Sequence, residues 1–335
     1  MSDICTMIQC FVWGFLVTLM ISPFVISLIK REKVKQVILN YVESHSAKSG
    51  TPTMGGITFI ISIILVSYIC FGENHSLGLV ALMIFFAYGL VGFLDDFIKF
   101  KFKRNLGLRA YQKIIFQLVV AVFVGIFVYK NQNIGSVLIV PFTNKTIDIG
   151  WWIVPLVALI YIATTNSVNL TDGLDGLASS TTLFYLLSFI SICLILLNSA
   201  FASFGEVQLA EYKNMILLAT VSAGAILSFL IFNCFPAKVF MGDTGSLALG
   251  SLVATVSVFT RMSLYIPILG IMFVASSVSV ILQVAYYKLT KKRIFLMAPL
   301  HHHFEKKGVH EVRITTIYSI ITLLVGVVSI LLNIL

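Results

Sequence analysis

The stretch LGLVALMIFFAYGLVGFLDDFIK, Leu77–Lys99, decides the class of fold, because an uncharged apolar run over 77–94 ends in two adjacent aspartates. A bilayer core takes about 20 apolar residues per helix. Outward from this run, comparable apolar segments lie at 11–30, 55–72, 111–130, 151–169, 174–198, 212–233, 245–260, 264–287 and 314–334. The sequence therefore predicts an all-α polytopic membrane protein with about ten transmembrane helices, and we expect residues 1–335 to form a single domain.

The composition excludes an ordinary soluble domain, since 59% of the residues are hydrophobic and only 11% are charged. The net charge of +9 does not require a nucleic-acid partner, because basic residues held on the cytoplasmic side of a membrane explain it. The first apolar run lacks a basic start and is followed by Lys30 and Arg31, so we interpret it as a retained span and not as a signal peptide. The five cysteines show no metal-ligand spacing and are interpreted as small core residues.

The basic residues also predict the orientation of the chain. With the N-terminus outside, only four of the 23 lysines and arginines lie in outer segments, namely Lys130, Lys145, Lys213 and Arg261. Because lysine and arginine accumulate on the cytoplasmic side, we expect both termini outside. In the long outer connection SVLIVPFTNKTIDIG (136–150), β-branched runs at 137–140 and 146–149 flank a turn region, which predicts a small external β-hairpin.

The polar blocks of the chain fall at the inner ends of the predicted spans. They are KSGTPTMGG (48–56), GFLDDFIK (92–99), NSVNLTDGLDGL (166–177), NCFPAKVFMGDTGS (233–246) and APLHHHFEKKG (298–308). Charges at membrane depth cost roughly 2.5–3.5 kcal/mol at a helix centre, and less near the interface. Solvated flanking residues are the alternative for any single block, but five blocks converging on one surface indicate a site.

The spacing of the acids suggests how they are arranged. Asn169, Asp172 and Asp175 recur every third residue, which on a helix places them on one face. Lys99 follows Asp95 and Asp96 by one helical turn, either as part of a site or as an ordinary surface ion pair.

The glycines on either side of Asp243 invite two interpretations. Gly242 and Gly245 would allow close backbone approach to a ligand just before a helix. The alternative is that Asp243 or Thr244 merely caps that helix.

Carboxylates and bases together indicate a metal–diphosphate site. Mg²⁺ prefers one or two carboxylates with phosphate oxygens and water. Lysines and histidines suit phosphates, and the candidates are Lys48, Lys99, Lys113, Lys238 and His301–His303. Zinc on the three histidines is a weaker alternative, because consecutive side chains do not easily converge on one tetrahedral ion.

Together, the five blocks resemble the signature motifs of the phospho-N-acetylmuramoyl-pentapeptide transferases, in the same order and from about Lys48 to Glu311. The resemblance implies Mg²⁺-dependent transfer of phospho-N-acetylmuramoyl-pentapeptide from its UDP-linked form to undecaprenyl phosphate, with release of UMP. It implies an active site facing the cytoplasm in a multi-pass protein of the bacterial inner membrane. It also suggests a homodimer.

The resemblance carries roles to individual residues. Asp243 would ligate Mg²⁺, and Asp95, with Asp96 beside it, would act on the lipid phosphate as base, metal ligand or electrostatic partner. His301, His302 and His303 would lie near the sugar-phosphate end, and Lys113 would join the catalytic group. The residues expected to bind substrate are Lys48, Thr53, Lys99, Asn169, Asp172, Asp175, Asn233, Phe240, which would stack on uracil, and Gln283.

Two other functions fit part of the sequence. The polyprenyl-phosphate N-acetylhexosamine-1-phosphate transferases share the acidic blocks, but their last loop is expected to carry arginines where this chain reads His-His-His-Phe-Glu. A transporter would place its site near the bilayer midplane, often between two repeated halves. No repeat is evident and the polar blocks lie at one face, which favours the transferase.

Overall fold

The computed structural model describes residues 2–31, 51–72, 74–102, 107–143, 145–197 and 204–335, and these are mostly helical. Within them, nine helices are long and apolar enough to cross a membrane, and α2 (Gly56–Cys70) is a shorter apolar helix. The nine are α1 (Ser2–Arg31), α3 (Ser76–Phe102), α4 (Ala110–Lys130), α5 (Ile153–Thr171), α6 (Leu177–Leu196), α7 (Glu206–Asn233), α8 (Gly242–Phe259), α10 (Ile271–Thr290) and α12 (Glu311–Ile334). The prediction of an all-α polytopic membrane protein is confirmed.

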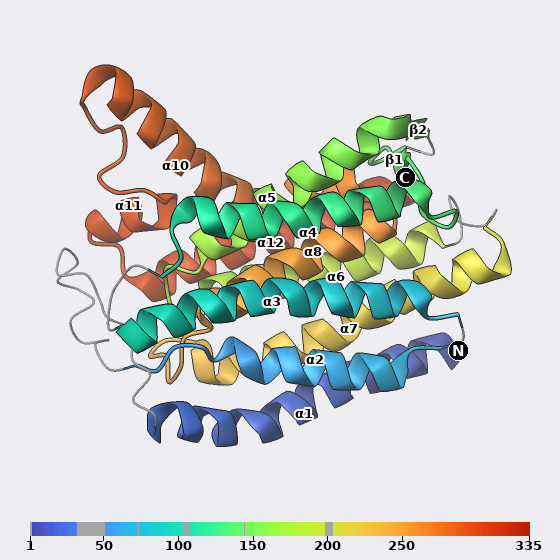
Figure 1. The fold of residues 1–335 in the computed structure, drawn as a ribbon, viewed down its shortest axis with the longest axis horizontal. Coiled ribbons are helices and arrows are strands. Elements are labelled where there is room, and N and C mark those ends of the chain that lie inside the picture. The colour runs from blue at the N-terminus through green and yellow to red at the C-terminus, as the bar shows by residue number, and fades with distance from the viewer. Residues whose placement is uncertain (1, 32–50, 73, 103–106, 144, 198–203) are drawn as a thin grey trace.

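Both termini lie at the same end of the helix bundle, together with the small sheet (Figure 1). Strand β1 (Val137–Ile139) pairs antiparallel with β2 (Thr146–Asp148), with Leu138 opposite Ile147. This is the predicted hairpin. The polar blocks that the structure describes lie at the other end of the bundle.

The prediction of one continuous span over 264–287 is wrong. The short helices η3 (Ser263–Tyr265) and α9 (Ile266–Leu269) come first, and Gly270 separates α9 from α10. Gly270 has φ −92° and ψ 27°, and a Cβ on it would lie 2.7 Å from the carbonyl oxygen of Ile266. The chain therefore changes direction at Gly270, and α10 diverges from the bundle (Figure 1).

Helix α8 forms the centre of the core and brings the acidic blocks together. It is buried from Thr244 to Phe259 and packs mainly against α3 and α5. Small residues permit close contact with α2 as well, since a Cβ on Gly56 would lie 2.3 Å from the Cα of Gly245. Because α8 begins where α3 and α5 end, its first turn lies beside their polar termini.

The interpretation of the cysteines as core residues holds only in part. Cys10 and Cys193 are buried, and Cys70 is half-buried. Cys5 and Cys234 are exposed, because they lie near the ends of α1 and α7, outside the apolar stretches that pack in the bundle.

Candidate active site

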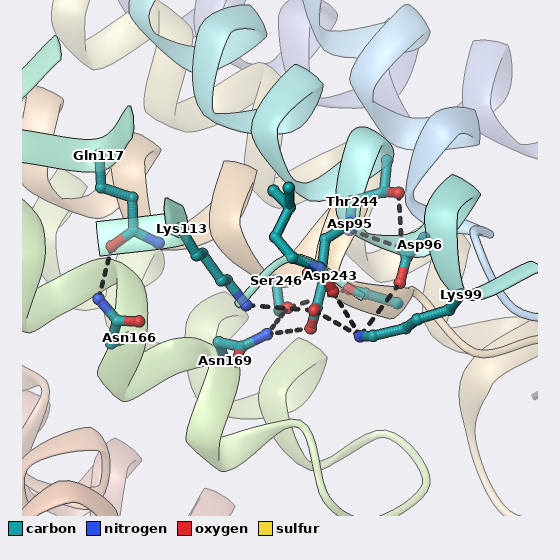
Figure 2. A network of polar contacts seen from close by, with 12 residues as sticks. Asp95, Asp96, Lys99, Lys113, Gln117, Asn166, Asn169, Asp243, Thr244 and Ser246 are labelled. Atoms are coloured by element: carbon teal, nitrogen blue, oxygen red, sulfur yellow. Dashed lines mark hydrogen bonds and ion pairs between the residues drawn. The ribbon is translucent and has the colours of Figure 1, made fainter. Parts of the chain in front are cut away.

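Three carboxylates from two helices form the centre of the site. Asp95 and Asp96 lie near the end of α3, and Asp243 lies in the first turn of α8 (Figure 2). One oxygen from each lies within 4.8 Å of the others. Asp95 and Asp96 are only 3% and 4% exposed. Like charges this close and this buried require cations nearby.

Two lysines supply those cations. The Nζ of Lys99 lies 2.5 Å from Asp95 Oδ2 and 2.7 Å from Asp243 Oδ2. From α4, Lys113 Nζ lies 3.1 Å from the same oxygen of Asp243. On the other side, Asn169 of α5 donates to Asp243 Oδ1 at 2.6 Å. Lys99 therefore does more than form an ion pair within its own helix, because it links α3 to α8.

Asp96 is held by the first turn of α8. Its Oδ2 accepts the backbone N–H of Thr244 at 2.9 Å and the Thr244 hydroxyl at 2.7 Å. The first N–H groups of a helix lack partners within the helix, and Asp96 satisfies one of them from a neighbouring helix. The alternative that Asp243 or Thr244 caps α8 is therefore wrong, since neither side chain bonds back to its own helix start.

The glycines around Asp243 make room for protein atoms. Gly242 has φ 72°, and a Cβ on it would lie 2.5 Å from Asp96 Oδ2. Gly245 packs against Gly56. Both glycines therefore let neighbouring protein segments approach closely, and their role toward a ligand stays a prediction.

The chain after α3 folds back over Asp95. Its Oδ1 accepts the backbone N–H of Leu108 at 2.8 Å, and a Cβ on Gly107 would lie 2.6 Å from that oxygen. Both oxygens of Asp95 are thus engaged, one by this amide and one by Lys99. No local pattern in the sequence indicates this contact.

The prediction that Asn169, Asp172 and Asp175 share one helix face is wrong. Helix α5 ends at Thr171, Asp172 follows it, and α6 begins only after Gly176, whose φ is 72°. Two glycines in this short connection let the backbone turn where a helix would have continued.

Asp172 and Asp175 therefore have different surroundings. Asp172 is half-buried and its carboxylate makes no hydrogen bond or ion pair to the described part of the chain. Burial, followed by the charges of Asp243, Asp96 and Asp175, raises the pKa of Asp172 well above its ordinary value. Asp175 instead accepts the backbone N–H of Ala237 at 2.9 Å.

Asn233, the last residue of α7, and Thr53, which precedes α2, both lie beside the segment between α7 and α8. Asn233 accepts the hydroxyl of Ser179 at 2.7 Å and donates to the carbonyl of Val239 at 3.1 Å. The next residue, Phe240, is half-buried, and its backbone pairs with Pro52 and Gly55 at 2.9 and 2.8 Å. Thr53 then lies beside Gly242. Lys48, which was expected in the same pocket, lies outside the described residues.

The three histidines lie on α11 (Leu300–Lys306) and have three different environments. His301 is fully buried, and neither ring nitrogen has a hydrogen-bond partner among the residues that the structure describes. Burial, then the neighbouring His302, lowers the pKa of His301 to about 3, so its ring is neutral. His302 pairs with Glu305 at 2.8 Å. His303 accepts the backbone N–H of Leu296 at 3.1 Å.

Gln283 and His303 together shape the loop before α11. The Oε1 of Gln283 accepts the backbone N–H groups of Ile294 and Phe295 at 3.1 and 2.9 Å.

The structure does not support a zinc site on the three histidines. Within the described residues, the only group of three or more candidate metal ligands is Asp95, Asp96 and Asp243.

Several contacts of the site were not anticipated. Ser246 accepts from Asn169 at 2.8 Å, and one helical turn deeper Gln117 accepts from Asn166 at 2.7 Å (Figure 2). The sequence does show that Gln117 and Asn166 are amides within apolar runs, and a buried polar side chain needs a hydrogen-bond partner. Their pairing across α4 and α5 depends on the tertiary structure.

Comparisons with known proteins agree with this arrangement. Residues 76–261 match the family model for glycosyl transferase family 4. A phospho-N-acetylmuramoyl-pentapeptide-transferase of Clostridioides difficile (strain 630) is 43% identical over 95% of both chains. Relatives with the same name from Clostridium novyi (strain NT) and Desulfitobacterium hafniense are 43% and 42% identical over 95% of this chain, and over 94% and 95% of their own. The chain therefore belongs to glycosyl transferase family 4 and, within it, to the phospho-N-acetylmuramoyl-pentapeptide-transferases.

Proposed function

We propose that this protein transfers phospho-N-acetylmuramoyl-pentapeptide from its UDP-linked form to undecaprenyl phosphate and releases UMP. A bond forms between a lipid phosphate oxygen and the sugar-linked phosphorus, and the bond from that phosphorus to the UMP phosphate breaks. The names of the relatives support this reaction. The observation that carries it is the cluster of three carboxylates and two lysines at one end of a membrane bundle.

We further propose that the reaction takes place at the cytoplasmic face of the bacterial inner membrane. The nucleotide substrate is water-soluble and the acceptor is a lipid, so a site at a helix end lets the two meet. The site lies at the end of the bundle opposite both termini, and the sequence assigns most of the basic residues to segments at this end.

Mg²⁺ is the cofactor that these residues fit. Three carboxylates facing two ammonium groups retain one net negative charge, and their oxygens are close enough to share a small cation. Asp243 is the proposed ligand, and Asp95 and Asp96 lie beside it. When bound, Mg²⁺ would neutralise charge on the phosphate oxygens.

Lys99 and Lys113 are proposed to hold phosphate oxygens during the transfer. Each ammonium group has three donors, so contacts with Asp243 leave others for substrate. Fixed positive charge placed where negative charge develops is a large source of catalysis in phosphoryl transfer. Asp95, which Lys99 also contacts, is proposed to orient the lipid phosphate.

The remaining residues are proposed to bind the nucleotide substrate. Phe240 offers a half-buried ring for uracil, and His301–His303 would lie at the sugar-phosphate end. The other proposed binding residues are Lys48, Thr53, Asn169, Asp172, Asp175, Asn233 and Gln283.

UMP release by purified protein tests this function. With undecaprenyl phosphate and Mg²⁺, release is expected from UDP-N-acetylmuramoyl-pentapeptide and not from UDP-N-acetylglucosamine. EDTA should abolish it, and Asp243→Asn should lower kcat by at least about 100-fold, since it removes a charge that Lys99 and Lys113 both contact.

The matched control is Asp148→Asn, the same change in the exposed hairpin, which should leave kcat within about twofold. Release only from the N-acetylglucosamine nucleotide would assign the protein to the sister transferases. No release from either nucleotide would contradict the proposal.

A further inference from the structure

Glu305 contacts a histidine that faces the candidate site. On one turn of α11, Glu305 Oε2 lies 2.8 Å from His302 Nδ1, and both side chains are largely buried. An ionised carboxylate only accepts hydrogen bonds, so Nδ1 is the donor. The contact therefore fixes the proton on Nδ1 and orients the Nε2 side of the ring.

The Nε2 side of His302 points at the connection between α5 and α6. A Cβ built on Gly173 would lie 3.0 Å from His302 Nε2 and 2.2 Å from His301 Nε2. Only glycine leaves space for two imidazoles at this position. Gly173 directly follows Asp172, which is coupled electrostatically to Asp243 and Asp96. His302 Nε2 thus faces the connection that carries Asp172.

The neighbouring rings fix the position of His302 further. Its ring centroid lies 4.4 Å from that of His301, which in turn lies 6.3 Å from Tyr318 of α12. His301 is buried and neutral, and His303 is engaged with the backbone of Leu296. Of the three histidines, His302 is the one whose Nδ1 meets a carboxylate.

We propose that Glu305 is a positioning residue, which holds His302 so that its Nε2 meets a phosphate oxygen of the nucleotide-linked substrate. The proposal rests on the proposed function. In the imidazolium form, a ring held at Nδ1 by a carboxylate presents an N–H donor at Nε2. A phosphate oxygen of a diphosphate accepts a hydrogen bond from such a donor.

Kinetics of single and double variants test the proposal. Glu305→Gln keeps an acceptor for Nδ1 but removes the charge, so kcat should fall about 10- to 100-fold, the usual value of a charge-assisted hydrogen bond. KM for the nucleotide should stay within about threefold. Adding Glu305→Gln to His302→Gln should lower kcat no further than His302→Gln alone, because Glu305 acts through His302.

Glu206→Gln, at the exposed start of α7, is the matched control for removing a glutamate and should leave kcat unchanged. Melting temperatures check that each variant is folded, and Glu305→Ala, which also removes the charge, replaces Glu305→Gln if the latter unfolds. Losses that multiply in the double variant, or a variant at position 305 with wild-type kcat, would overturn the proposal.

A spectroscopic measurement tests the contact without activity. In ¹⁵N-histidine-labelled protein, Glu305→Gln should shift the Nδ1 resonance of His302, identified by its loss in His302→Gln. An unchanged spectrum would overturn the contact. Wild-type protein that releases no UMP would instead overturn the proposed function, and the spectrum would still decide whether Glu305 orients the ring.

Discussion

Asp172 shows how the site stores unfavourable energy at a single residue. The carboxylate is half-buried, lacks a partner in the described part of the chain, and faces the charges of Asp243, Asp96 and Asp175. Its raised pKa means that folding favours the protonated acid. Such residues persist where function needs them, at a cost in stability.

Replacing Asp172 by asparagine should therefore stabilise the protein and impair catalysis. Because the folded-state pKa is raised, the favourable contribution of the protonated acid is complete below about pH 4 and is lost as the pH rises through the folded-state pKa. We expect Asp172→Asn to raise the free energy of unfolding by about 1–2 kcal/mol at pH 8 and by less at pH 5. Melting temperatures at both pH values measure the gain, and UMP release measures the loss. A variant less stable than wild type at pH 8 would show that Asp172 has a stabilising partner.

At the scale of elements, the site depends on how closely α3 and α8 cross. A Cβ on Gly92 would lie 2.1 Å from the carbonyl oxygen of Asp243 and 2.6 Å from the backbone nitrogen of Thr244. The two backbones thus touch at the turn that carries Asp243. Asp96, one turn further along α3, then caps α8 through Thr244.

Gly92→Ala should separate α3 from α8 and disable the site. The backbone of α8 cannot yield as a flexible side chain can, so Asp243 would move away from Lys99 and Lys113. We expect kcat to fall at least about 100-fold and stability to fall by about 1–3 kcal/mol.

Gly89→Ala, on the same helix, is the control for the Gly92 variant. Its added Cβ would meet the end of the Ile60 side chain at 3.1 Å and Ala248 at 3.6 Å, and Ile60 can rotate. We expect kcat within about threefold of wild type. Equal effects at both glycines would indicate general damage to α3 instead of displacement of Asp243.

The elements also show what the sequence could and could not predict. Apolar runs located the helices because the bilayer demands length and hydropathy, and alternating β-branched residues located the hairpin. The helix break at Gly270 was not predicted, because a single glycine within an apolar run is also compatible with a continuous helix. The turn at 172–176 was missed because a three-residue spacing was interpreted as a helix face, whereas Gly173 and Gly176 end the regular backbone.

What the sequence could not predict about the site has a similar cause. The blocks around Asp95 and Asp243 were expected to converge, and the structure brings them together with Lys99, Lys113 and Asn169. The capping of α8 by Asp96 and the return of Leu108 to Asp95 depend on helix crossing, which leaves no periodic pattern in a sequence. The sequence therefore indicates which polar residues belong to the site, but which of them contact one another depends on the fold.

At the scale of the whole molecule, the proposed location of the reaction requires that the two ends of the bundle face different compartments. The hairpin and both termini lie at one end, and the acidic cluster lies at the other (Figure 1). All but four of the lysines and arginines belong to segments assigned to the site's end. Because lysine and arginine accumulate on the cytoplasmic side, this distribution supports the proposed cytoplasmic position of the site.

Two native cysteines provide a direct measurement of this orientation. Cys5 is exposed near the N-terminus, outside the apolar run that begins at residue 11, and Cys234 is exposed at the end of α7 beside the site. In variants that keep only one of these cysteines, a membrane-impermeant maleimide should label Cys5 in intact spheroplasts. It should label Cys234 at least about tenfold more after the membrane is opened, because the reagent then reaches the cytoplasmic face. Labelling of Cys234 in intact spheroplasts would place the acidic cluster outside, where UDP-linked precursors made in the cytoplasm cannot reach it.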